Sequence, residues 1–156
     1  MAGGLHAESL VSTPGVSHLY LVDPYALDSD DTEGLEHWGH NAPPLAQLET
    51  EARERLAKYG GQVTFVKLTS MAASSSSQIP PQVDFVYIDG NHSYRAVLED
   101  IRAWWPKIRP GGVLGGHDFY NGYARAHDGV VKAVTEFAVS NRLALQVELP
   151  DWWIFK

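Results

Sequence analysis

Residues 83–120 decide the fold that we expect for this chain. They read VDFVYIDGNHSY, then RAVLEDIRAWWPKI, then RPGGVLGGHDFY. The first and third strings contain apolar runs typical of buried parallel strands, and the second has the period of a helix. Asp89 and His92 follow the first run, and His117 and Asp118 follow the second. Because parallel strands end at the same edge of a sheet, we predict a site at that edge.

The rest of the chain alternates between strand and helix in the same way. Apolar strand-like runs occupy 19–22, 62–70, 143–149 and 152–156, and helical periods occupy 5–10, 45–59 and 129–140. The last two strands are separated by a Pro150-Asp151 turn, so they must pair antiparallel. We therefore predict a single α/β domain over residues 1–156, with a doubly wound Rossmann-like sheet and a C-terminal antiparallel hairpin.

Several of these elements carry more detailed expectations. In the first helix, Leu5, Ser9 and Leu10 can share a face, and in the second, Glu51 and Arg55 have the spacing of an i,i+4 ion pair. The run at 83–88 is too continuously apolar for a strand with one wet face, which favours a central position. The glycine-rich run at 111–116 is costly in a strand unless backbone or ligand approaches closely.

Composition and charge exclude several classes of function. A net charge of -7, from 12 basic and 19 acidic residues, offers no electrostatic basis for binding nucleic acid. With no cysteine there is no disulfide framework, so any metal must be bound by oxygen and imidazole. Neither a membrane span nor a signal peptide is indicated, which makes the cytosol the expected compartment. The sequence leaves room for a homo-oligomer.

Four strings together resemble one known family. LVDPY at 21–25, DFVYIDGNHSY at 84–94, AWWPKIRPGGVLGGHDF at 103–119 and GVVKAVTEF at 129–137 are similar to class I S-adenosylmethionine-dependent methyltransferases. Within that class they resemble the small single-domain group related to rhamnosyl and macrolide-sugar O-methyltransferases. The resemblance implies S-adenosylmethionine as cofactor, a small hydroxylated, sugar-like acceptor and, in metal-dependent relatives, Mg²⁺.

The resemblance also assigns roles to individual residues. It implies that Asp23 binds the ribose hydroxyls of the cofactor, that Asp89 and His92 are catalytic, and that His92 is the general base. The residues that it places at the cofactor are Gly3, Gly4, Asp23, Thr69, Ser70 and Asp89. The metal ligands that it implies are Asp89, His117 and Asp118. Where relatives often carry Glu-Asp, this chain has His117-Asp118, which leaves the identity of the metal open.

The front of the chain departs from the family pattern. The first strand of the family and its GxGxG turn should precede the first helix, but only Met1 and Ala2 precede Gly3. We therefore expect Gly3 and Gly4 to be the end of that turn, in an N-terminally truncated domain whose sheet lacks the first strand.

Two other functions are compatible with the residues. A domain without its first strand could be non-catalytic and bind a partner through its exposed sheet edges. Alternatively, Asp89, His92, His117 and Asp118 could form the centre of a metal-dependent hydrolase. Local structural roles also compete with function, because Asp89 could cap the following helix and Asp23 could be a turn residue before Pro24.

Overall fold

The computed structural model describes residues 2–26, 44–119 and 128–156. They form two compact units, Met1–Ile79 and Pro80–Lys156, which we call the N-terminal and the C-terminal unit. This division does not decide whether residues 1–156 act as one domain, which stays a prediction. Among the described residues, every helix is too short or too polar to cross a membrane.

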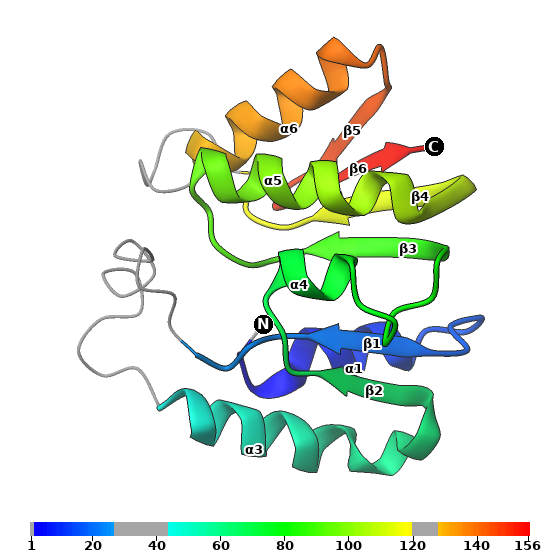
Figure 1. The fold of residues 1–156 in the computed structure, drawn as a ribbon, viewed down its shortest axis with the longest axis vertical. Coiled ribbons are helices and arrows are strands. Elements are labelled where there is room, and N and C mark those ends of the chain that lie inside the picture. Colours follow the sequence, from blue (N-terminus) through cyan, green and yellow to red (C-terminus); the bar gives the residue numbers. More distant parts are fainter. Residues whose placement is uncertain (1, 27–43, 120–127) are drawn as a thin grey trace. The chain divides into compact units, whose positions relative to one another are not determined.

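The N-terminal unit contains a parallel pair of strands with helices packed against it (Figure 1). Its elements are η1 (Ala2–Gly4), α1 (Leu5–Val11), β1 (Leu19–Val22), α3 (Leu45–Leu56), η2 (Ala57–Gln62), β2 (Val63–Val66) and α4 (Ser70–Ser74). Ala7, Val11, Leu21 and Leu56 form its buried core, so both α1 and α3 contribute to one cluster with β1. The strand predicted at 19–22 is thus confirmed, whereas the strand predicted at 62–70 is shorter than expected: β2 covers Val63–Val66, and α4 begins at Ser70.

Two details of the predicted helices in this unit were wrong. Leu5 is 65% exposed, and Ala7 and Val11 are the buried residues of α1. Arg55 does not pair with Glu51; its guanidinium lies 3.4 Å from Glu8. The periodicity of one helix cannot reveal such a contact, because Glu8 belongs to a different helix.

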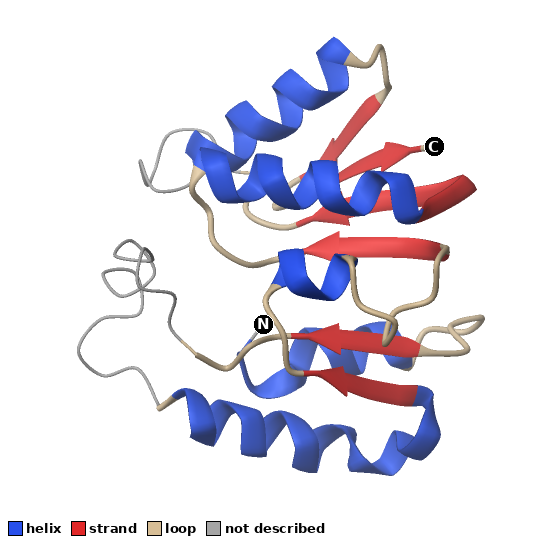
Figure 2. Cartoon of the chain, in the orientation of Figure 1, coloured by secondary structure: helices blue, strands red, loops and turns tan. Residues whose placement is uncertain are grey.

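The C-terminal unit is a four-stranded sheet with two helices on one side (Figures 1 and 2). Its elements are β3 (Val83–Ile88), α5 (Tyr94–Trp104), η3 (Trp105–Lys107), β4 (Ile108–Gly116), α6 (Asp128–Ser140), β5 (Leu145–Glu148) and β6 (Asp151–Phe155). The strand order is β3-β4-β6-β5, with β3 parallel to β4 and both other pairs antiparallel. The α/β fold and the C-terminal hairpin are therefore confirmed.

The two helices of this unit build its core together with the inner face of the sheet. Val97, Leu98 and Ile101 of α5 are buried against Val134 and Phe137 of α6. The central position predicted for residues 83–88 does not hold within this unit, because β3 is an outer strand of its sheet and Phe85 is 37% exposed.

The glycines of β4 allow two tryptophans to lie directly on the strand. A Cβ atom at Gly115 would come within 2.3 Å of the Trp153 ring, and one at Gly116 within 2.6 Å of the Trp152 ring. Both distances are far below ordinary contact, so these positions exclude a side chain. The expectation that a glycine-rich strand marks a close approach of backbone is confirmed by β3, whose Ile88 carbonyl oxygen would lie 2.5 Å from a Cβ at Gly116; from β6 the approaching groups are mainly the tryptophan side chains.

Candidate active site

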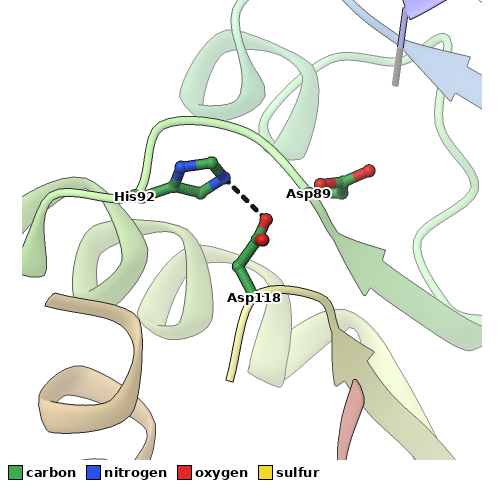
Figure 3. Close-up of side chains that lie close together, drawn as sticks. All are labelled: Asp89, His92 and Asp118. Carbon is green, nitrogen blue, oxygen red and sulfur yellow. Dashed lines mark ion pairs between the residues drawn. The ribbon is translucent and has the colours of Figure 1, made fainter. Parts of the chain in front are cut away.

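Three side chains in the C-terminal unit meet at the ends of β3 and β4. Asp89, His92 and Asp118 each offer one potential ligand atom, and these atoms all lie within 4.8 Å of one another. The closest contact joins His92 Nε2 and Asp118 Oδ2 at 2.8 Å (Figure 3). All three side chains are partly buried. Two carboxylates and an imidazole facing one point are the donor set that a divalent cation needs.

The register of the two strands explains this meeting. Ile88 is the partner of Gly116 in the parallel β3–β4 pair, so the residues that follow them leave the sheet at the same edge. The His117 N–H donates to the Ile88 carbonyl at 3.0 Å and extends this pairing by one residue. Asp118 then takes a left-handed backbone conformation, with φ 61°. Aspartate tolerates that conformation better than most residues, which favours an acid at this turn.

The segment between β3 and α5 places His92. The Ser93 N–H donates to Asn91 Oδ1 at 2.8 Å, and Ser93 Oγ in turn accepts from the Ala96 N–H at 3.3 Å. Ser93 is therefore the N-cap of α5. The alternative role of Asp89 as the helix cap is wrong, because the chain uses Ser93 for that purpose.

The contacts between these groups shift their pKa values in opposite directions. The hydrogen bond with Asp118 raises the pKa of His92, although burial of the ring works against it. Burial would raise the pKa of Asp118, but hydrogen bonds from His92 and His117 outweigh it and hold this pKa well below its usual range. Both shifts favour the charged pair, an imidazolium facing a carboxylate, over the neutral one.

His117 lies beside the cluster and outside its three-residue core. Its Nδ1 is 3.2 Å from Asp118 Oδ2, and its side chain is 32% exposed. The sequence grouped His117 with Asp89 and Asp118 as metal ligands, whereas the structure groups His92 with these two acids. His92, which was predicted as the general base, thus also lies where a metal ligand would lie.

A tyrosine and an acid near the cluster were missed by sequence reasoning. The Tyr87 hydroxyl donates to Asp151 Oδ1 at 2.5 Å, from β3 across β4 to β6. Burial raises the pKa of Tyr87 most, followed by the bond to Asp151, with further contributions from Asp89 and Asp118. No local pattern in the sequence indicates this pair, because the contact depends on the order in which β3, β4 and β6 lie in the sheet.

In the N-terminal unit, Asp23 follows β1 directly. Its Oδ1 accepts from the Tyr25 N–H at 2.7 Å, and its own N–H donates to the Val66 carbonyl at 3.2 Å. Tyr25 takes a left-handed conformation with φ 47°, which is unusual for a bulky residue. Burial raises its pKa to about 12, with the charges of Asp23 and Glu49 adding to the effect. The turn role of Asp23 is therefore real, and it fixes one carboxylate oxygen.

The other residues predicted at the cofactor also lie in the N-terminal unit. Thr69 is the N-cap of α4, its hydroxyl accepting from the Ala72 N–H at 3.3 Å, and Ser70 begins that helix. Gly3 and Gly4 both have positive φ, at 67° and 76°, which favours glycine at these positions. A Cβ at Gly4 would also lie 3.1 Å from the Ala52 backbone, so packing on α3 constrains it further.

Comparison with known proteins identifies the family. Residues 4–119 match the model of a family described as a methyltransferase domain. No curated protein sequence matches the chain. Among solved structures, the O-methyltransferase NovP is similar to 89% of the chain, with a TM-score of 0.64 and 16% identity. The match covers 60% of NovP, so the chain spans about three-fifths of its length.

Two further solved structures share the fold. CalS11, a TDP-rhamnose 3′-O-methyltransferase of calicheamicin biosynthesis, has a TM-score of 0.59 and 10% identity over 96% of this chain and 64% of its own. The SAH-bound methyltransferase PaMTH1 of Podospora anserina has a TM-score of 0.54 and 12% identity over 70% of this chain and 57% of its own. At these identities the likeness shows a common fold.

Proposed function

The chain belongs to the methyltransferase-domain family, and we propose that it is a cytosolic S-adenosylmethionine-dependent O-methyltransferase. Its acceptor would be a small hydroxylated, sugar-like molecule, with a divalent cation assisting the reaction. The observation that carries this proposal is the meeting of Asp89, His92 and Asp118 after two neighbouring parallel strands. Open α/β sheets bind their ligands at such strand ends. The names of NovP and CalS11 support O-methyl transfer, and that of CalS11 supports a sugar acceptor.

The three side chains fit a divalent cation by their chemistry. Asp89 and Asp118 supply hard oxygen donors, and His92 supplies an imidazole nitrogen within 4.8 Å of them. Mg²⁺ prefers oxygen alone, whereas an imidazole nitrogen favours a transition-metal dication, so we use Mn²⁺ beside Mg²⁺ as a probe of this set. A cation held there would lower the pKa of an acceptor hydroxyl.

His92 has two roles that exclude each other at one nitrogen. As the general base predicted from the sequence, it would take the proton of the acceptor hydroxyl. As a ligand, it would use the same Nε2 that faces Asp118. We favour the ligand role when a cation is present, because Nε2 already points to Asp118 (Figure 3), and the ligand atoms of all three residues lie within 4.8 Å of one another. The acceptor proton would then pass to water.

The cofactor half of the proposal rests on the N-terminal unit. Asp23 has one carboxylate oxygen engaged by the Tyr25 N–H, which fixes the side chain and leaves its second oxygen to accept from ribose hydroxyls. When bound, the cofactor would supply a sulfonium methyl group: the acceptor oxygen would bond to the methyl carbon as the carbon–sulfur bond breaks, and S-adenosylhomocysteine would leave. The protein's own part is to hold and orient both reactants.

Calorimetric titration tests this function. The chain is titrated with S-adenosylmethionine, with and without Mg²⁺ or Mn²⁺, and separately with Mn²⁺ alone. We expect cofactor binding in the micromolar range and a separate heat for Mn²⁺. If neither ligand gives heat, the non-catalytic reading replaces this one. Tight metal binding together with hydrolytic turnover in the absence of the cofactor would favour a hydrolase.

The role of His92 is decided by one variant. If His92 is a ligand, His92→Ala weakens Mn²⁺ binding by about 10-fold or more. If it acts only as a base, the Mn²⁺ affinity of His92→Ala stays at the wild-type value. Arg95→Ala is the matched control, because this exposed residue lies only three positions after His92, as the second residue of α5, and pairs with Glu99.

A further inference from the structure

Gly129, the second residue of α6, lies directly against the loop that carries His92. A Cβ atom at this position would be 2.4 Å from the His92 carbonyl oxygen, 2.5 Å from the Tyr94 nitrogen and 3.0 Å from the Ser93 carbonyl carbon. All three are main-chain atoms, so no side-chain rotation can relieve the overlap. The chain therefore needs the smallest residue here for a reason unrelated to φ.

We infer that Gly129 is a positioning residue for His92. By letting α6 approach the backbone of residues 92–94, it sets the place from which the imidazole reaches Asp118. The inference rests on the proposed cation site formed by Asp89, His92 and Asp118. It assigns a part in that site to an α6 residue that carries no functional group.

The loop is held on its other side as well. Ser93 caps α5 through the Ala96 N–H, and Asn91 accepts from the Ser93 N–H, so the loop is tied to the start of α5. Helix α6 is in turn fixed to α5 by a shared buried core that includes Val97, Ile101 and Val134. The buried parts of both helices cannot move away without disturbing that core, so residues 92–94, which run from the loop into the first residue of α5, are the part that has to yield.

The expected displacement of residues 92–94 is large enough to remove His92 as a metal ligand. Ordinary contact begins at 3.4 Å, so an added methyl group at 2.4 Å from the His92 oxygen requires a shift of 3.4 minus 2.4, or about 1 Å. Metal–ligand distances tolerate only about 0.2 Å. A shift several times larger than that tolerance removes a ligand, while the core of the unit can remain packed.

The test measures Mn²⁺ affinity by calorimetry for four proteins: the wild type, Gly129→Ala, His92→Ala and the double variant. We expect Gly129→Ala to weaken Mn²⁺ binding about 10-fold or more. If Gly129 acts through His92, the double variant binds no more weakly than His92→Ala alone. A purely structural role for Gly129 would instead give effects that add.

Gly90→Ala is the matched control. Gly90 lies in the same loop, its φ is not in the left-handed region, and a Cβ there would meet nothing within 4 Å. Its Mn²⁺ affinity should equal that of the wild type. Far-UV circular dichroism and thermal unfolding accompany each measurement, and Gly129→Ala should remain folded, because alanine favours a helix more than glycine does.

The outcomes separate this inference from the proposed function. If the wild type binds no Mn²⁺, the cation site fails and the inference falls with it. If the wild type binds and Gly129→Ala binds equally well, or if the effects add in the double variant, only the inference is overturned. An unfolded Gly129→Ala would also overturn it, since the glycine would then serve the fold and not one side chain.

Discussion

The end of β1 and the ends of β3 and β4 carry the same kind of residue but use it differently. Asp23, after β1, bonds to the N–H of Tyr25, two residues further along the chain. Asp118, after β4, bonds to His92, which follows a different strand. The first contact is local and forms a turn, whereas the second joins two segments that only the parallel pairing of β3 and β4 brings together.

This difference teaches how each acid can serve a ligand. A carboxylate fixed by its own turn is pre-set to accept hydrogen bonds from a bound molecule. A carboxylate facing another acid and an imidazole creates a field that attracts a cation or a proton. The N-terminal unit therefore suits a neutral hydroxylated group, and the C-terminal unit suits a metal ion.

We expect the largest effect when the charge of Asp118 is removed. Asp118→Asn keeps the shape of the side chain but removes a charged donor, so Mn²⁺ affinity should fall by about 100-fold or more. Calorimetry compares the Mn²⁺ affinity of this variant with that of the control Asp84→Asn. The Asp84 side chain is 77% exposed and pairs with Arg109. Equal affinities for the two variants would show that the cluster does not bind metal.

Removing Asp23 tests the other side of the comparison. Asp23→Ala should weaken S-adenosylmethionine binding by about 10- to 100-fold, because a hydrogen bond to a charged group is worth about 1.5–3 kcal/mol. Its Mn²⁺ affinity should not change. Glu148→Ala, at an exposed acid of β5, is the control. Unchanged cofactor binding in Asp23→Ala would remove the ribose assignment.

Two substitutions at Tyr25, with side chains of similar size, test the turn at Asp23. Asparagine accepts a left-handed backbone, whereas β-branched valine resists it, so Tyr25→Asn should be more stable than Tyr25→Val by about 1 kcal/mol. Urea unfolding at neutral pH gives the difference. If Tyr25→Val is the more stable variant, burial of the side chain matters more for stability than the φ of 47°.

The smallest expected effect is a pH dependence of stability in metal-free protein. The pKa of His92 is raised above 6.5 and that of Asp118 is lowered below 3.8, so their attraction is fully present between these two values. It fades as the pH rises through the raised pKa of His92, and as the pH falls through the lowered pKa of Asp118.

Unfolding free energies of the wild type and His92→Gln, measured in EDTA from pH 3 to 9, reveal this dependence. Their difference should be largest near pH 5 and shrink towards both ends of the range. A difference that stays constant with pH would show that the His92–Asp118 contact carries no charge interaction.

The sequence alone was enough to predict the approximate positions of the main strands and helices, and the sheet edge at which Asp89, His92 and Asp118 lie. Apolar runs and helical periods are local properties of the chain, and the positions of Asp89 and Asp118 after two such runs followed from them. Even the role of the glycine-rich strand could be stated in advance, because a strand that accepts the cost of glycine needs close contact.

Which residues meet was decided by tertiary structure. The sequence placed Asp89, His92, His117 and Asp118 at one edge, and the fold puts His92 in direct contact with Asp118 while His117 lies beside the three-residue cluster. It offered Asp89 as a helix cap, whereas the chain uses Ser93. The place of Gly129 depends on how α6 packs against the loop before α5. Periodicity reports the face on which a residue lies, but contacts between distant segments depend on register and packing, which no single segment contains.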